Sequence, residues 1–183
     1  GSGGVIFNIT GGYTETTPVG GFRITAKGTA TNQIIFQKAS GANPVITAAV
    51  PNAGSLSDGI FKLIGADYVT IRGLTLQEHA TAANITPGTN NQTEWGVAFL
   101  QASLTDGAQN DSIQGNTISL NRAYTNSFGI YGNTSHNEAT PTAATAITNA
   151  TGANSNNHVV SNSISNVNVG IAFIGSASGG FYD

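Results

Sequence analysis

Apolar and polar residues alternate along this chain in short runs of four to six residues, which Gly, Asn, Ser and Thr separate. The clearest run is GADYVTIRGLTLQEH at positions 65–79, where aliphatic residues occupy every second position of each strand-like half. A period of two predicts β-strands that bury one face, and the runs are too short for a helical repeat. Arg72, Glu78 and His79 then lie outside the core.

Two motifs recur in alternation, which indicates an internal repeat. The first is a Gly-led apolar strand, found as GIFKL (59–63), GVAFL (96–100), GIYGN (129–133) and GIAFI (170–174). The second is a strand, a turn and another strand, found as IRGLTL (71–76), IQGNTI (113–118) and VVSNSI (159–164). The Gly-led strands follow one another at intervals of 37, 33 and 41 residues. Short strands with variable spacing are typical of a solenoid whose length variation lies in loops.

In a parallel β-helix, equivalent side chains of successive coils stack in columns. The expected columns are Ile60, Val97, Ile130 and Ile171, and Ile71, Ile113 and Val159. Asn116 falls over Asn162, which predicts a short ladder of stacked amides at a corner. The glycine that opens the first motif is expected to adopt a positive φ at another corner.

The length of 183 residues predicts a single domain with a sizeable core. Residues 1–4 (GSGG) are typical of a tag remnant. Residues 5–50 are expected to form N-terminal coils and a cap that protects the open end of the stack. Residues 51–183 supply the other coils, and we expect truncation at the C-terminal end because the pattern still runs at 170–174.

Composition narrows the classes of partner. Charged residues are only 8% of the chain, against a usual share of about 25%. Six scattered Lys and Arg residues and a net charge of −3 cannot form the basic stripe that tracks nucleic acid. No run of 18 apolar residues exists, so we expect no membrane span. The absence of cysteine excludes disulfides, thiolate catalysis and Cys-based zinc sites.

Three segments carry a resemblance to a known family. NQIIFQKASG (32–41), LIGADYVTIRGLTLQ (63–77) and IQGNTI (113–118) resemble the right-handed parallel β-helix repeats of secreted and cell-surface proteins of Bacteroidetes-like bacteria, within the pectin-lyase-like superfold. The resemblance spans residues 20–175 and implies an all-β, right-handed parallel β-helix of about four to six coils with long loop insertions. It implies export but no activity, since the fold hosts enzymes and non-catalytic stalks alike. The acidic clusters of the pectin-cleaving relatives are absent from this sequence.

Ionisable and aromatic residues gather in the segments between the second motif and the next Gly-led strand. If these loops stack, they form one face with a potential for ligand binding. The candidate ligand-binding residues are Trp95, Glu94, Glu78, His79, Arg72, Arg122 and Tyr124. A Trp beside carboxylates is a common arrangement for stacking a sugar ring and binding its hydroxyls. The sequence nevertheless favours local packing of Trp95 against the coil, because this residue directly precedes the Gly-led strand.

The sequence supports catalysis and metal binding less well than ligand binding. Glycoside hydrolysis needs two carboxyl groups about 5–9.5 Å apart, and the sequence alone does not establish that separation for Glu78 and Glu94. No HxH or HExxH spacing predicts a transition-metal site. The turn DGAQND (106–111) is either a calcium ligand set made by Asp106, Asn110 and Asp111, or an Asx-rich turn. We therefore predict no cofactor and no metal.

These observations favour a non-catalytic β-helix module of a secreted or cell-surface bacterial protein, an adhesin-like spacer for which carbohydrate binding on one loop face is an additional candidate property. The alternative is a polysaccharide lyase or glycoside hydrolase that uses Glu78, Glu94, Arg72 or Arg122. The expected partners are a polysaccharide or a cell-surface glycan of a host, and further copies of the chain that stack end to end.

Overall fold

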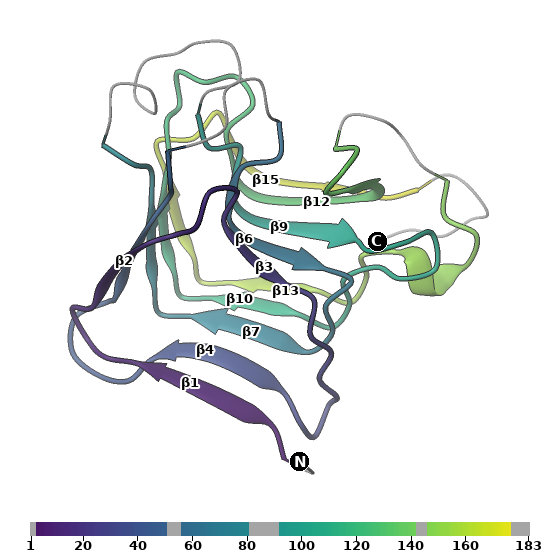
Figure 1. Ribbon diagram of the computed structural model, residues 1–183, viewed down its shortest axis with the longest axis horizontal. Helices are drawn as coiled ribbons and strands as arrows, with labels where there is room; N and C mark the ends of the chain where they lie inside the picture. The colour runs from purple at the N-terminus through teal and green to yellow at the C-terminus, as the bar shows by residue number, and fades with distance from the viewer. Residues whose placement is uncertain (1–2, 51–55, 81–91, 142–145, 177–183) are drawn as a thin grey trace.

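The computed structural model describes residues 3–50, 56–80, 92–141 and 146–176. It is a right-handed parallel β-helix of five coils, and each coil contributes one strand to each of three five-stranded parallel sheets (Figure 1). The predicted fold class is confirmed, and the coil number falls within the expected range. One short 3₁₀ helix, η1 (Ala150–Gly152), lies between β12 and β13.

The three sheets, named A, B and C, take their strands in chain order. Sheet A contains β1 (Val5–Ile9), β4 (Ile34–Lys38), β7 (Val69–Arg72), β10 (Ser112–Gln114) and β13 (His158–Val160). Sheet B contains β2 (Thr14–Thr16), β5 (Val45–Thr47), β8 (Thr75–Gln77), β11 (Thr117–Ser119) and β14 (Ser163–Ser165). Sheet C contains β3 (Phe22–Ile24), β6 (Gly59–Ile64), β9 (Trp95–Gln101), β12 (Phe128–Asn137) and β15 (Val169–Ile174).

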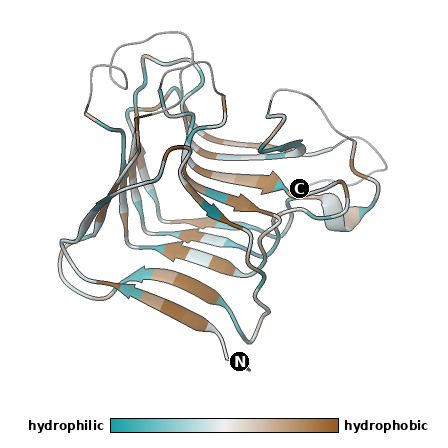
Figure 2. Ribbon diagram, in the orientation of Figure 1, coloured by the Kyte–Doolittle hydropathy of each residue, from teal (hydrophilic) through white to brown (hydrophobic). Residues whose placement is uncertain are grey.

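The core consists of inward columns of aliphatic and aromatic side chains. Ile71, Ile113 and Val159 align in register across sheet A, as predicted. Figure 2 shows the same recurrence as hydrophobic bands at matching places on successive strands. Ile71 and Ile113 are fully buried, and burial of such a side chain stabilises the fold by about 1.5–3 kcal/mol. The columns therefore hold each coil to the next.

The predicted column in sheet C is wrong by one residue in β6. Phe61, not Ile60, aligns with Val97, because Gly59 pairs with Trp95 and not with the glycine after it. The shift places the Phe61 ring inside the helix, where its centroid lies 5.4 Å from that of Phe22. Ile60 is fully buried nevertheless.

The prediction for the glycines that open the first motif is also wrong. None of them has a positive φ. A Cβ atom on Gly96 would lie 2.5 Å from the Gly129 carbonyl oxygen, so glycine is needed there for close approach between coils. Positive φ occurs instead in the turn from sheet A to sheet B, at Gly73 (70°), Gly115 (59°) and Ser161 (56°).

The N-terminal segment forms coils 1 and 2, and no described residue forms a separate cap over β1, β2 and β3. The end of the stack is a hollow of about 370 Å³. Four Phe and three Ile side chains line most of it: Phe7, Phe22, Phe36, Phe61, Ile9, Ile24 and Ile46. Phe7 is 47% exposed there. Residues 1–2 of the expected tag remnant and the C-terminal residues 177–183 lie outside the described ranges.

Candidate functional site

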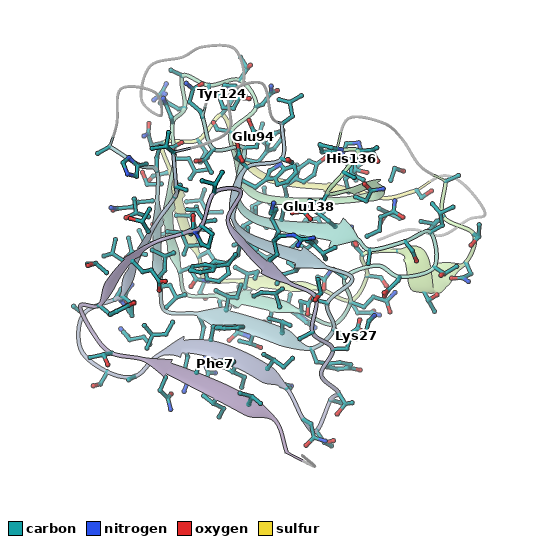
Figure 3. The ribbon with its side chains drawn as sticks, in the orientation of Figure 1. Phe7, Lys27, Glu94, Tyr124, His136 and Glu138 are labelled. Atoms are coloured by element: carbon teal, nitrogen blue, oxygen red, sulfur yellow. The ribbon has the colours of Figure 1, made fainter. Side chains whose placement is uncertain are left out.

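Glu94 links three successive coils at the corner between sheets B and C (Figure 3). It lies just before β9 and is 2% exposed. The Tyr124 hydroxyl, from the loop before β12, donates to Glu94 Oε1 at 2.6 Å, and the backbone N–H of Asp58, before β6, donates to Oε2 at 2.8 Å. Burial raises the pKa of Glu94 to about 8 against the opposing effect of these donors. Glu94 thus connects loops that the sequence predicted to stack.

Glu78 has different partners, although it enters the same corner. Its carboxylate accepts from the Thr93 hydroxyl at 2.6 Å and from the Thr93 N–H at 3.2 Å. It therefore joins the two described ends of the loop between β8 and β9, whose residues 81–91 lie outside the described ranges. His79 is half-buried, and Arg122 on the next coil is exposed. The two glutamates are thus engaged by separate hydrogen-bond donors.

Trp95 is 3% exposed and packs on the outer face of sheet C. Its ring stacks on Tyr131 with centroids 5.4 Å apart and an interplanar angle of 10°. The Phe128 ring lies 5.1 Å from that of Tyr131 at a tilt of 59°. The Trp95 ring consequently presents no free flat face, which is the arrangement expected for local packing.

A pocket of about 320 Å³ lies beside this aromatic group. Its walls are Leu56, Glu94, Trp95, Asn126, Phe128, Tyr131, His136 and Pro141. Tyr131 and His136 form a pair, with 2.5 Å between the hydroxyl oxygen and Nδ1. Burial raises the pKa of Tyr131 and lowers the pKa of His136. The pocket therefore combines aromatic walls with a carboxyl group, an imidazole and an amide.

Three residues of this pocket, Asn126, Tyr131 and His136, were not predicted from the sequence as part of a site. Tyr131 belongs to the Gly-led strand, which was read only as scaffold. His136 joins the pocket because β12 continues to Asn137, beyond the predicted strand, with a register irregularity between Gly132 and Asn137. One feature of the sequence could have located Tyr131 and His136: Tyr131 is an aromatic residue at the outward position of GIYGN (129–133), and His136 follows it by five residues.

The structure does not bring Arg72 to this corner. Arg72 lies on the outer face of sheet A, in register with Gln114 as expected, and its Nε donates to Gln37 Oε1 at 2.8 Å. A shallow groove of about 400 Å³ runs past it toward the turn into sheet B. The candidate residues therefore divide between two separate corners of the helix.

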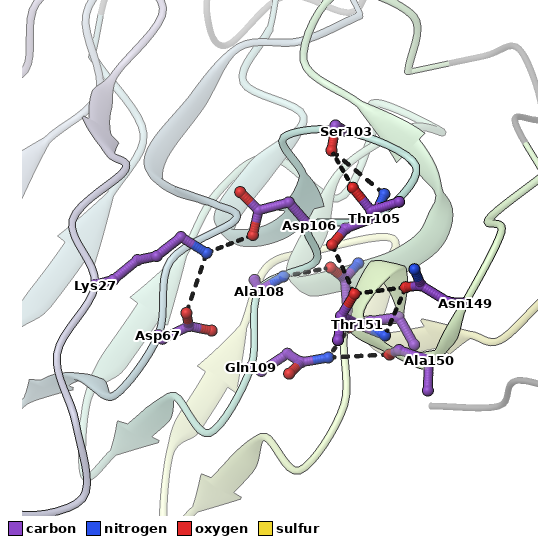
Figure 4. A network of polar contacts seen from close by, with 12 residues as sticks. Lys27, Asp67, Ser103, Thr105, Asp106, Ala108, Gln109, Asn149, Ala150 and Thr151 are labelled. Atoms are coloured by element: carbon purple, nitrogen blue, oxygen red, sulfur yellow. Dashed lines mark hydrogen bonds and ion pairs between the residues drawn. The ribbon is translucent and has the colours of Figure 1, made fainter.

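The remaining charged residues tie loops to coils. Figure 4 shows Lys27, after β3, between Asp67 and Asp106, and its Nζ lies 3.1 Å from Asp67 Oδ2. On the outer face of sheet C, Glu138 pairs with Lys62 at 2.5 Å and with Arg23 at 2.6 Å. Lys62 is almost completely buried. These pairs fold the segment after β12 back over coils 1 and 2.

The turn DGAQND is not arranged as one ligand set. Asp106 faces Lys27, whereas Asp111 is fully buried and accepts from the Val69 N–H at 2.7 Å. No group of three or more His, Asp or Glu residues that could hold a metal occurs in the ranges given above. The two aspartates thus serve different contacts.

Comparisons with protein-family models, with curated proteins and with solved structures found no match. Among the described residues, no helix has the length and apolar character needed to cross a membrane.

Proposed function

We propose that this protein is a non-catalytic β-helix module of a secreted or cell-surface protein, in which it acts as a rigid spacer. One observation carries the proposal: nine of the few ionisable side chains each bind backbone or an opposite charge that joins one coil or loop to another. They are Arg23, Lys27, Lys62, Asp67, Glu78, Glu94, Asp106, Asp111 and Glu138. The resemblance of the repeats to those of exported proteins supports the location.

Mechanical rigidity follows from the architecture. Three sheets run the whole length of the stack, so each coil is joined to the next by three sets of hydrogen bonds and by inward columns. Strands of neighbouring coils are about 4.8 Å apart, so five coils set a fixed distance between whatever lies beyond the two ends. A spacer needs this constant length and no reactive cleft.

A hydrolytic or eliminating activity on polysaccharides is the competing function, and it has a direct test. Wild-type protein, Glu94→Gln and Glu78→Gln would be incubated with acidic and neutral polysaccharides, and new reducing ends and unsaturated products would be measured. The proposal expects no turnover by any of the three proteins. Turnover by the wild type that is lost in either variant would replace the spacer with an enzyme.

Carbohydrate binding in the pocket beside Trp95 is a second candidate function. The observation that favours it is the combination of the Trp95, Phe128 and Tyr131 rings with the polar groups of Glu94, His136 and Asn126 around a space of about 320 Å³. Such pockets hold one small ring between aromatic walls and a few polar contacts. A polysaccharide or a cell-surface glycan is the partner that this chemistry fits.

Trp95 is the only tryptophan, so its fluorescence reports directly on the pocket. Titration with a panel of neutral and acidic oligosaccharides should give a saturable change. Asn126→Ala should weaken it, and Arg122→Ala, on the same corner but exposed and outside the pocket, should leave it unchanged. A flat response for the whole panel would eliminate the glycan site while leaving the spacer proposal intact.

A further inference from the structure

Two carboxylates occupy column positions that neutral residues fill in the other coils, and each carries an inference of its own. The first is Glu15 in β2. It aligns with Ile46, and the same inward column continues through the three aliphatic residues Leu76, Ile118 and Ile164. Glu15 is exposed, lines the apolar hollow at the end of coil 1 and accepts from the Tyr13 hydroxyl at 3.2 Å.

The two ends of the helix are complementary in shape and direction. Coil 1 carries the outer strands of all three sheets at one end, and coil 5 carries them at the other. The edge at coil 5 exposes Val160, Ile171, Phe173 and Ile174 by 39–50%. Coil 5 of a second copy, placed on coil 1, would continue every sheet in the parallel sense already used by the four junctions inside the molecule. The position facing Ile164 of that copy would be Glu15.

We propose that the end formed by β1, β2 and β3 is a stacking surface for coil 5 of a second copy, and that Glu15 keeps it closed in the wild-type protein. Stacking would bury the carboxylate in an aliphatic column, and Arg23, the cation that lines the hollow, is already paired with Glu138, so burial is unfavourable. An inward-pointing charge on an edge strand is an established means of preventing edge-to-edge pairing. Head-to-tail contacts of this kind do not close into a ring. Replacement of Glu15 would therefore yield an open series of oligomers.

Glu15→Ile tests the proposal, with Thr16→Ile as the matched control. Thr16 is the exposed next residue of β2 and aligns with Thr47 and Gln77, so it lies on the outer side. Light scattering after size-exclusion chromatography should show a monomer for the wild type and for Thr16→Ile. Glu15→Ile should show a mass that rises with protein concentration. A monomeric Glu15→Ile protein, or equal association of the control, would overturn the proposal.

Engineered cysteines then test the register, since the natural chain has none. Asn8 and Val160 belong to one outward column, so the proposed stacking places them on neighbouring strands of two copies. That strand spacing, about 4.8 Å, lies within disulfide range. In the Glu15→Ile background, Asn8→Cys with Val160→Cys should give a ladder of cross-linked species on oxidation. Ile6→Cys with Val160→Cys, displaced by two residues, should not. Dimers from Asn8→Cys alone would indicate pairing of like ends and contradict the model of stacking.

The second carboxylate, Asp111, occupies a position that belongs to the amide ladders between coils. Asn116 accepts from the N–H of Leu74, its equivalent in the preceding coil, at 3.0 Å, and donates to the Ile71 carbonyl at 3.0 Å. Asn157 repeats this arrangement one coil later: it accepts from the Asp111 N–H at 2.9 Å and donates to the Ala108 carbonyl at 3.0 Å. In both cases the side-chain oxygen of the asparagine accepts from the N–H of the equivalent residue in the preceding coil. The side-chain nitrogen donates to the carbonyl of the residue three positions before that equivalent residue.

Asp111 occupies the same kind of position. Its Oδ1 accepts from the N–H of Val69, its equivalent in coil 3, at 2.7 Å. The same arrangement directs Oδ2, in place of an amide nitrogen, at the carbonyl of Ala66, three residues before Val69. Asp111 and Ala66 are both completely buried, and Oδ2 has no partner among the described atoms. A carboxylate oxygen facing a carbonyl is repulsive, whereas an acid hydroxyl there donates a hydrogen bond.

We infer that Asp111 is held as the neutral acid and that its hydroxyl completes the ladder between coils 3 and 4. Two charged groups face it from the neighbouring elements, Asp67 before β7 and Lys27 after β3. Burial raises the pKa of Asp111 to about 8, and Asp67 adds to this effect while the Val69 N–H and Lys27 oppose it. The folded-state pKa is raised, so the stability from this proton is fully present below about pH 4 and is lost as the pH rises to about 8.

Asp111→Asn is the test, because asparagine supplies permanently the donor that the acid supplies only when protonated. The ratio of the folding equilibrium constants of Asp111→Asn and wild type should rise by up to about tenfold per pH unit between about pH 4 and pH 8. It should then level off. Asp106→Asn, which removes a partly exposed partner of Lys27, should not show this rise. A pH-independent ratio for Asp111→Asn would overturn the inference.

Infrared spectroscopy gives a second readout that does not depend on unfolding. A protonated carboxyl has a C=O stretch separate from that of a carboxylate. The wild type at neutral pH should show this band, and Asp111→Asn should have lost part of its intensity, the remainder belonging to Glu94. An identical band in both proteins would contradict a neutral Asp111.

Discussion

The corner from sheet A to sheet B turns within two residues in each of coils 3, 4 and 5, whereas the corner from sheet C to sheet A spans four, ten and twenty residues in the corresponding coils. The first is held by neutral amides, with Asn116 and Asn162 bonded to each other at 3.0 Å. The second also carries amides next to sheet A, where Asn157 accepts from the Asp111 N–H, but its loops are attached by ions as well, with Lys27 between Asp67 and Asp106. Uniform short turns place equivalent residues on top of one another, while loops of unequal length keep that repeat only next to sheet A and use charged side chains as further attachments.

The largest effect should come from removing the buried amide of the short corner. Asn116→Ala removes the partner of the buried Leu74 N–H and one donor to the Ile71 carbonyl, which should cost about 2–4 kcal/mol of unfolding free energy. Urea unfolding followed by Trp95 fluorescence measures it. Asn162→Ala, in the more exposed last coil, should cost less. Equal losses at the two positions would mean that the ladder has no special role.

Removal of the anion on the outer face of sheet C should rank second. Glu138→Ala leaves the buried Lys62 ammonium with only the Ser57 carbonyl among its described partners, and we expect a loss of about 2–3 kcal/mol. Glu138→Gln keeps the shape and the hydrogen-bond acceptor, so it should lose less. The comparison is made by urea unfolding at two salt concentrations. Unchanged stability of Glu138→Ala would show that the pairs add nothing.

A carboxyl group introduced at the corner from sheet A to sheet B should make the unfolding free energy depend on pH. Asn116→Asp places an acid in a fully buried amide position, and we expect a loss of about 1–3 kcal/mol at pH 8 that becomes smaller toward pH 4 as the acid takes up a proton. Thermal unfolding of wild type and variant across this range measures the change. A loss that is constant with pH would show that this corner does not impose protonation on the acid.

The smallest effect is expected at the exposed ion pairs of the long corner. Lys27 has a side chain that is 47% exposed, so Lys27→Ala should cost no more than about 1 kcal/mol, and high salt should reduce the difference. Arg122→Ala, at an exposed position without a predicted structural role, should remain within about 0.5 kcal/mol of wild type. A loss at Lys27 as large as that at Asn116 would reverse the order of the two corners.

The sequence predicted those parts of the fold that depend on strict repetition. Ile71, Ile113 and Asn116 recur at equal offsets from a short turn, so their columns could be aligned without coordinates. Ile60 could not be aligned correctly, because the loop before β9 is long and hides a shift of one residue. The prediction of a positive φ for the glycines was wrong for another reason. A close approach of two coils and a positive φ both favour glycine, so the residue type alone does not distinguish them.

The candidate site was predicted less well than the fold. Proximity of Glu94 and Tyr124 followed from the stacking of equivalent loops. The partners of Trp95 did not, because Tyr131 and His136 reach it through an irregular extension of β12. Arg72 was expected beside these residues although it is the last residue of the sheet A strand β7, since the sequence does not show how far apart two corners of one coil lie. Whether these residues bind a ligand stays a prediction.

The contacts of Glu138 have a consequence for how the whole molecule unfolds. In an ideal solenoid each repeat interacts only with its neighbours, so the terminal repeats can fray without disturbing the rest. Glu138 follows the coil 4 strand β12, yet it pairs with Arg23 in coil 1 and Lys62 in coil 2. This contact skips over coil 3 and couples the N-terminal end to the far part of the stack. The five repeats are thereby expected to melt as one cooperative unit, and not one after another from the open end.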